Sequence, residues 1–227
     1  MKQIILLLTP FILFAQSYTF SGGQENVAQI VAGKILTKAY AKAGIKIKNL
    51  FLPPEQALES SNSGQSDGEL ARIKDITKMY PNLVQVPVSL VSVAAFAYSK
   101  NHTLKINSWS DLSGHNFTVV KGTKFIEKAT KNLQKETVNS FKEAFDRLNR
   151  GETEIIIVPK KAAVRIIVQK NYKEIKSVSP ALMKVKLYHF VHKKNIHLIP
   201  IITPILQKMQ DSGELTYLEK AYLQNSY

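Results

Sequence analysis

The sequence contains no cysteine in its 227 residues. Disulfide bonds, thiolate metal sites and a cysteine nucleophile are therefore excluded. A lipoprotein anchor is excluded as well, because its lipid is attached to a cysteine at the processing site. The chain is long enough for one large domain or two small lobes, and its 44% hydrophobic and 21% charged residues are ordinary for a soluble globular protein.

Long hydrophobic runs are also scarce, and the one at the N-terminus, Ile4–Ala15, is too short for a span of about 20 residues. Lys2 precedes this run, and Ala15 and Ser17 place small residues at positions −3 and −1 of a cut after Ser17. The pattern predicts a secretory signal peptide over residues 1–17, with an N-terminal membrane anchor as the alternative. A cleaved chain without a lipid anchor is expected in the periplasm.

Acidic residues are few, with 17 Asp and Glu against 31 Lys and Arg, which gives a formal net charge of +14. Nucleic-acid binding is disfavoured because the lysines are spread along the chain and aromatic residues do not alternate with them. Lys34, Lys38 and Lys42 recur every four residues and predict one solvated helix face. The positive field would steer an anionic ligand or would serve solubility alone.

Hydrophobic periodicity predicts an α/β chain in which strands and helices alternate. Strands are expected at about 18–20, 45–51, 67–73, 83–88, 91–99, 117–120, 154–158 and 185–191, and helices at about 28–43, 53–61, 125–132, 141–149, 159–169, 198–209 and 215–223. Repeated βα units favour doubly wound, mostly parallel sheets. The polar segment 100–103 after a long strand is expected to cross between two lobes.

Five segments in order along the chain resemble motifs of the bacterial extracellular solute-binding proteins of family 3. They are Leu58–Asp67, Trp109–Leu112 with Gly114 and Lys121–Thr123, Leu148–Gly151 with Glu154–Ile157, Tyr188–Asn195 with Leu198, and Met209–Leu215. The resemblance covers nearly the whole chain after the predicted signal peptide. It implies the type II periplasmic-binding-protein fold of ABC amino-acid importers, with two α/β lobes joined by two hinge crossovers. Lobe 1 would comprise residues 18–97 and 188–227, and lobe 2 residues 98–187.

The first predicted binding element is the turn Gly122–Thr123 between a strand and a helix. Members of the family use this turn to bind a ligand carboxylate, and free N–H groups at the start of a helix suit an anion. Lys124 stands where the family has a second small hydroxyl residue. The alternative is a plain helix cap by Thr123.

The second predicted element is the pair Glu69 and Arg72. The carboxylate-binding arginine of the family lies several residues later, where this chain has none, so we expect Arg72 to clamp a ligand from a shifted position. On a regular strand the two side chains would point to opposite faces. A structural Glu69–Arg72 ion pair and a solvent-facing Arg72 are the alternatives.

Further ligand contacts are predicted near the N-terminus of the mature chain. The loop Ser21–Asn26 has two glycines that would leave N–H groups accessible, although an ordinary strand-to-helix turn explains it equally well. Glu25 in this loop is a candidate for binding a polar group of the ligand. Phe20, with Tyr18 and Tyr98, would supply an aromatic wall or pack in the core.

These features predict a binding protein that delivers a small anionic or amino-acid-like solute to an ABC importer. The family's ammonium-binding acid is replaced by Val158–Lys160, so an α-amino acid is not the obvious ligand. An orphan periplasmic sensor or regulatory protein of the same fold is the alternative, and a small-acid dehydratase is a third. No metal, cofactor or nucleic-acid partner is expected, and the protein is expected to be a monomer and not an enzyme.

Overall fold

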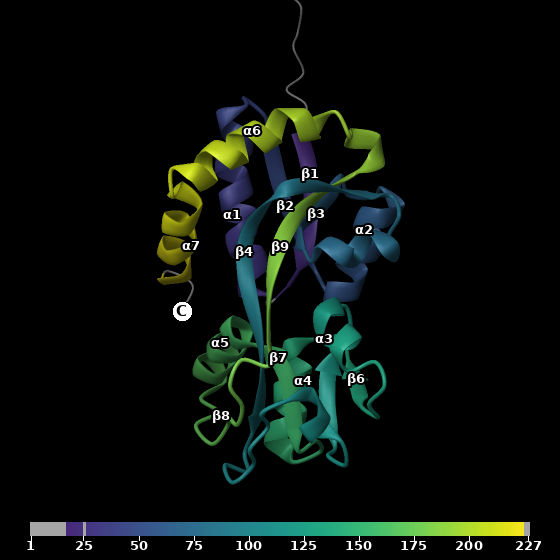
Figure 1. Cartoon of the computed structure of the whole chain (residues 1–227), viewed down its shortest axis with the longest axis vertical. Helices are drawn as coiled ribbons and strands as arrows, with labels where there is room; N and C mark the ends of the chain where they lie inside the picture. Colours follow the sequence, from purple (N-terminus) through teal and green to yellow (C-terminus); the bar gives the residue numbers. More distant parts are fainter. Residues whose placement is uncertain (1–16, 25, 225–227) are drawn as a thin grey trace, which may run out of the picture.

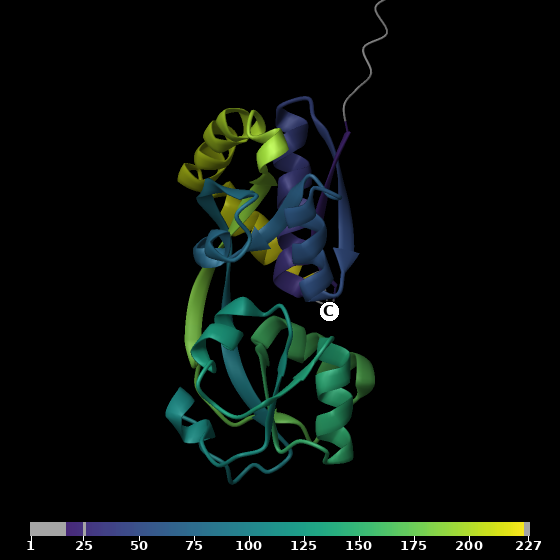
Figure 2. The same ribbon diagram turned by 90° about the vertical axis from the view of Figure 1, so that its right-hand side faces the viewer.

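The computed structural model describes residues 17–24 and 26–224 of the chain. The predicted signal peptide, apart from Ser17, and the candidate residue Glu25 lie outside these residues. Figure 1 shows two lobes, one above the other, connected by the long strands β4 (Leu83–Ser99) and β9 (Met183–His192). Figure 2 shows the same two lobes from the side, with the connecting strands along one edge of the junction.

The upper lobe holds the first and the last of the described elements. Its elements are β1 (Ser17–Gly23), α1 (Val27–Lys42), β2 (Lys46–Leu52), α2 (Pro54–Ser63), β3 (Gly68–Arg72), the 3-10 turns η1 (Lys74–Lys78) and η3 (Lys193–Asn195), α6 (Leu198–Asp211) and α7 (Glu214–Gln224). Helices cover both faces of its strands (Figures 1 and 2).

The lower lobe is built from the middle of the chain. Its elements are η2 (Trp109–Leu112), β5 (Phe117–Val120), α3 (Lys124–Ala129), β6 (Glu136–Val138), α4 (Phe141–Arg150), β7 (Ile155–Pro159), α5 (Lys160–Lys170) and β8 (Lys176–Ser177). The upper and lower strands form one hydrogen-bonded series, β2-β1-β3-β9-β4-β7-β5-β6, with β8 beside β4.

The pairing pattern shows why the molecule has two lobes. Neighbours within each lobe run parallel, as β1 does with β2 and β3, and β5 with β6 and β7. The connecting strands pair antiparallel with each other, and each joins one lobe, β9 to β3 and β4 to β7. Both lobes are therefore doubly wound α/β units, which confirms the predicted fold class.

Local sequence accounts for the helix ends and the buried faces. Asn26 caps α1 by accepting a hydrogen bond from Gln29 N, and Ser140 caps α4 in the same way. Gly151 ends α4 in the left-handed conformation, with φ of 77°. The apolar stripe of α1 is fully buried and comprises Ala28, Val31, Ala32, Ile35, Leu36 and Ala39. Burial of each larger side chain contributes about 1.5–3 kcal/mol, so this stripe anchors the helix to the sheet.

Two expectations about β4 differ from the structure. The predicted strands 83–88 and 91–99 are one strand, whose pairing with β9 shifts register between Gln85 and Ser89 and again between Ser89 and Val91. Pro87 cannot donate a ladder hydrogen bond, so the chain continues extended through an irregularity rather than ending. The crossing between lobes thus lies within β4.

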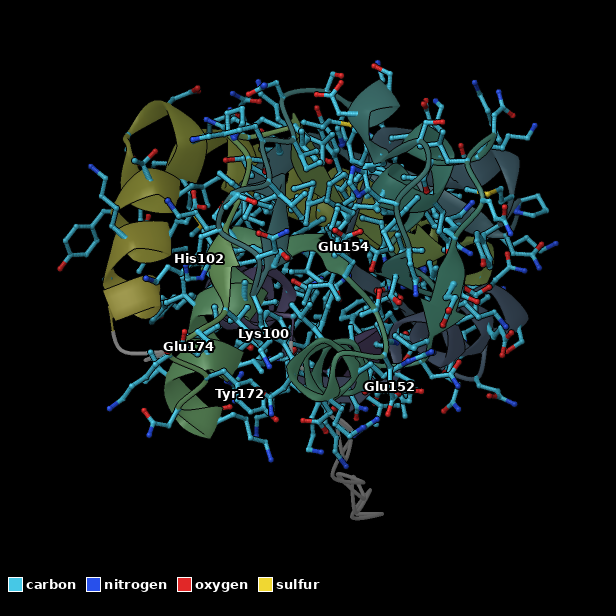
Figure 3. The ribbon with its side chains drawn as sticks, turned by 90° about the horizontal axis from the view of Figure 1, so that it is seen from below. Lys100, His102, Glu152, Glu154, Tyr172 and Glu174 are labelled. Carbon is cyan, nitrogen blue, oxygen red and sulfur yellow. The ribbon has the colours of Figure 1, made fainter. Side chains whose placement is uncertain are left out.

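The polar segment 100–103, expected to cross between the lobes, lies instead at the lower end of the molecule, where Figure 3 labels Lys100 and His102. There Lys100 donates a hydrogen bond to Asn149 O, at 2.9 Å, and His102 Nε2 donates one to Glu174 O, at 2.7 Å. Residues 95–98 pair with β7 of the lower lobe. The exact lobe boundaries at residues 98 and 188 remain predictions.

The upper core contains one fully buried histidine, His189. Its Nδ1 donates to Glu69 O at 2.9 Å, so the neutral ring presents Nε2 as an acceptor to the Tyr40 hydroxyl, also at 2.9 Å. The Phe20 ring meets the imidazole edge-on, with centroids 4.6 Å apart. Burial away from water lowers the pKa of His189 to about 4.

We predict that this histidine makes the stability of the fold depend on pH. Between its folded pKa of about 4 and the unfolded value of about 6.5, the unfolded chain binds more protons. The contribution of His189 to the free energy of unfolding is complete above the unfolded pKa of about 6.5. It is lost as the pH falls toward 4, by up to about 1.4 kcal/mol per pH unit. Urea unfolding at pH 6.5, 5.5 and 4.5 measures how steeply the free energy of unfolding changes with pH.

His189→Gln is expected to flatten this dependence while lowering stability at neutral pH. His102→Gln, at an exposed position in the lower lobe, is the matched control and should leave the slope unchanged. An unchanged slope in His189→Gln would contradict the assignment.

Candidate functional site

The candidate site lies where the carboxyl ends of strands from the two lobes face each other. In open α/β sheets this is the edge where ligands bind. Asn26, Gln29 and Arg72 of the upper lobe and Gly122 and Thr123 of the lower lobe line a single cavity of about 30 Å³. The cavity has room for about one water molecule, so the lobes are closed on each other here.

Arg72 is the centre of this site. Its side chain is only 7% exposed. Nε donates to Glu69 Oε1 at 2.8 Å, Nη2 to Pro54 O at 2.8 Å, and Nη1 to Gly122 O at 3.0 Å. The first two acceptors belong to the upper lobe and the third to the lower lobe. The guanidinium therefore ties the lobes together, and the alternative of a Glu69–Arg72 pair is the arrangement that the structure contains.

An irregularity in β3 brings the two charged side chains together. Pairing of β3 with β9 shifts register between Glu69 and Arg72. On a regular strand, residues three apart point to opposite faces. The shift removes that restriction, so the end of the strand places both groups in one buried cluster.

Glu69 is fully buried and satisfied by protein donors. Besides Arg72, it accepts hydrogen bonds from Gln29 Nε2, Ser21 Oγ and Ser61 Oγ, each at 3.3 Å. Burial raises the pKa of Glu69, and the nearby guanidinium and hydroxyls oppose that shift. The carboxylate does not reach the cavity, so it orients Arg72 rather than offering itself to a ligand.

The turn at Gly122 packs directly against the upper lobe. Its φ is +84°, and a Cβ there would lie 2.5 Å from Glu55 N and 2.6 Å from Pro54 C. Its own N–H donates to Glu127 Oε1 at 2.7 Å. The predicted anion donor is thus occupied by a carboxylate of the following helix in the closed state. Thr123 is buried beside it and lines the cavity.

A second link between the lobes involves Lys124, which the sequence marked only as a departure from the family pattern. Its Nζ lies 2.7 Å from Glu55 Oε2 and 3.0 Å from Glu127 Oε2. The hydroxyl of Tyr80 donates to Glu55 Oε1 at 3.0 Å. Burial disfavours the ammonium, but the two carboxylates outweigh it and raise the pKa of Lys124 to about 12.

Other predicted contacts lie away from the cavity. Phe20 is fully buried and stacks on Tyr40, with ring centroids 5.3 Å apart, so the prediction of a ligand-facing Phe20 is corrected to core packing. Its side chain points into the upper core because strand residues alternate between faces. The loop predicted at 21–26 is shorter, because β1 continues through Gly23. Glu25 is outside the described residues.

A neighbouring cavity of about 190 Å³ extends the site along the junction and is lined by cations. Lys160, Lys161 and Lys184 contribute to its wall, together with Asn26 and Pro159. Lys161 forms a further link between the lobes, 2.8 Å from Glu219 Oε1. Among the residues that the structure describes, no group of three or more His, Asp or Glu side chains is arranged to hold a metal ion.

We predict that Gly122→Ala holds the lobes apart. The added Cβ would collide with backbone atoms, which cannot move aside as a flexible side chain can. Small-angle X-ray scattering should give a larger radius of gyration than for the parent protein. Gly114→Ala is the control, because Gly114 has a φ of +85° but nothing within 4 Å of its Cβ position. Equal radii for the two variants would contradict the prediction.

Arg72→Met should lower the free energy of unfolding by about 3–5 kcal/mol, because it leaves the Glu69 carboxylate buried without its cation. Adding Glu69→Gln removes the unpaired charge. The double variant should therefore lose less free energy of unfolding than the two single variants lose together. Urea unfolding of all four proteins completes the cycle. Simple additivity would show that the two groups do not stabilise each other.

Comparison with known proteins places the fold. No protein-family model and no curated protein matches the chain. Similar solved structures include a histidine kinase sensor domain with similarity to periplasmic binding proteins, with a TM-score of 0.77 and 13% identity over 92% of this chain and 96% of that one. A mutant of ArgBP from T. maritima has a TM-score of 0.76 and 14% identity over 92% and 95%.

An amino-acid ABC transporter substrate-binding protein from Streptococcus pneumoniae, bound to L-arginine, has a TM-score of 0.73 and 14% identity over 92% of this chain and 95% of its own. The Streptococcus protein is a substrate-binding protein of the kind that the sequence motifs resemble. At such low identity the similar structures establish the architecture and not the ligand. The chain has the two-lobed fold of periplasmic binding proteins.

Proposed function

We propose that the protein captures a small anionic or amino-acid-like solute between its two lobes and delivers it to an ABC importer. The observation that carries the proposal is the meeting of Arg72 from one lobe with Gly122 and Thr123 from the other at a single cavity. The similar amino-acid transporter protein supports the same use of the fold. Hinge closure around a ligand is the motion that this architecture permits.

Arg72 is prepared for such a role by its surroundings. Two of its bonds, to Glu69 and Pro54 O, stay within the upper lobe. The bond from Nη1 to Gly122 O crosses to the lower lobe and breaks when the lobes separate. Opening would then expose a fixed, oriented guanidinium edge, which is the geometry that binds a carboxylate.

The charge around the junction favours an anion. Glu69, Glu55 and Glu219 are each paired with a cation of the protein. Lys160 and Lys184, by contrast, line the adjoining cavity without an ion pair to any described residue. A solute with a carboxylate and no obligatory ammonium group fits this balance best.

The size of the cavity requires the lobes to open for loading. About 30 Å³ between Arg72 and Thr123 cannot hold a solute, whereas small-molecule sites usually measure roughly 300–1,000 Å³. Separation of the lobes about β4 and β9 would join this space with the neighbouring cavity of about 190 Å³. The described closed form is then the state that a solute must displace or rearrange.

Export to the periplasm, a monomeric state and an ABC permease as partner belong to this proposal. None of the helices within residues 17–24 and 26–224 has the length and apolarity to cross a membrane. The likeness to a substrate-binding protein of an amino-acid transporter is in keeping with a role without catalysis.

A periplasmic sensor of the same fold is the second candidate, and the likeness to a histidine kinase sensor domain favours it. Both roles use the same cleft and differ in the membrane protein that recognises the closed form. Co-purification of the tagged protein with a permease or with a membrane kinase separates them.

We predict that amino acids, dicarboxylates, keto acids or small peptides include a compound that stabilises residues 18–227. A ligand at 100 times its dissociation constant stabilises a protein by about 2.7 kcal/mol, which is roughly 5–10 °C in melting temperature for a chain of this size. A thermal-shift screen detects the compound, and calorimetry measures its affinity.

Arg72→Lys retains the positive charge but loses the planar guanidinium, whose paired N–H groups can bind both oxygens of a carboxylate. It should weaken solute binding at least about tenfold, equal to about 1.4 kcal/mol. Lys38→Gln on the exposed face of α1 is the control and should leave the affinity unchanged. Full affinity in Arg72→Lys would remove Arg72 from the site. No stabilisation by any compound of the panel would count against a solute receptor.

A further inference from the structure

A larger cavity borders the small one beside Arg72 and shares Ile73 and Phe125 with it. It measures about 490 Å³. Its walls come from η1 in the upper lobe, α3 in the lower lobe and the connecting strand β9. Figure 1 shows α3 at the top of the lower lobe and β9 crossing the junction. The larger cavity is therefore separate from the solute cleft but bordered by the same moving parts.

The walls of this hinge-side cavity are mainly apolar. Ile73, Phe125, Ala129, Met183, Val185 and Tyr188 contribute to them. Met183 and Val185 are alternate residues of β9, so their side chains share one face of that strand. An apolar space of this volume falls within the usual range of small-molecule sites, roughly 300–1,000 Å³.

The charges at the rim are predominantly positive. Asp75 is paired with Lys128 at 2.9 Å, so its carboxylate is already neutralised. Lys74 and Lys186 line the same cavity, are exposed, and form no ion pair with a residue that the structure describes. An apolar floor with unpaired lysines at its mouth is complementary to a molecule with an apolar body and one anionic end.

We propose that the hinge-side cavity binds a small amphiphilic carboxylate, with its apolar body against Phe125 and Val185 and its carboxylate near Lys186. Because both lobes and β9 form the walls, an occupant contacts groups whose spacing changes when the lobes open. Binding here is consequently linked to the closed arrangement, and by reciprocity it changes the affinity of the solute cleft.

Isothermal titration calorimetry with octanoate, octanol and octylamine tests the site, with the last two as probes that lack the negative charge. Octanoate should bind the parent protein, and the two analogues should bind at least several-fold more weakly. Ala129→Trp fills the cavity from α3 and should abolish octanoate binding. Lys186→Gln should weaken it about two- to fivefold, the range of an exposed ion pair.

Lys38→Gln is the control, because this exposed lysine on α1 lines neither the hinge-side cavity nor the solute cleft. It should leave octanoate binding unchanged. Octanoate binding that is lost in Lys38→Gln, or that survives in Ala129→Trp, overturns the proposal, as does no binding to the parent protein at millimolar concentration. Failure of the solute screen above leaves this result intact, because the probes and variants differ.

Discussion

The buried guanidinium of Arg72 is the interaction on which the arrangement of this protein depends. It neutralises Glu69 inside the upper lobe and holds Pro54 O at the start of α2. Its third bond, to Gly122 O, reaches the lower lobe. A carboxylate that is fully buried needs such a partner, because an unpaired buried charge costs several kcal/mol. The same ion pair that stabilises one lobe therefore also presents a donor to the other.

Several direct contacts hold the two lobes against each other. Lys124 pairs with Glu55 across the junction, Lys128 with Asp75, and Lys161 with Glu219. The exposed Lys128–Asp75 pair contributes little alone, about 0–1 kcal/mol, whereas the charge-assisted hydrogen bond of the buried Arg72 is stronger than a neutral one. A solute can shift the equilibrium between open and closed forms only by the difference in its affinity for them. The contacts that the protein makes with itself thus set the affinity that a solute must exceed.

Much of the fold could be predicted because its elements carry local signals. The apolar period of α1, the cap at Gly151 and the continuous apolar run of β7 each specify one element without help from the rest of the chain. The short elements could not be predicted in this way. β6 has three residues and is held by its parallel pairing with β5, and β4 remains one strand across Pro87 because β9 supports it on both sides of the irregularity. Contacts between distant segments decide such cases, and local propensity does not.

The sequence by itself determined the alternation of strands and helices, the absence of disulfides and the excess of positive charge, because these follow from residue types and their spacing. The two-lobed class of fold was what the resemblance of its motifs to a known family implied. The sequence also singled out Glu69, Arg72 and Gly122. Only the tertiary structure decided what these residues do to one another. The register shift in β3 joins Glu69 to Arg72, and packing of Gly122 against Pro54 closes the cleft. The hydrogen bond from Arg72 to Gly122 joins residues 50 positions apart, and the packing of Gly122 on Pro54 spans a longer stretch of chain. Both contacts depend on where the two lobes meet, which no local pattern in the chain encodes.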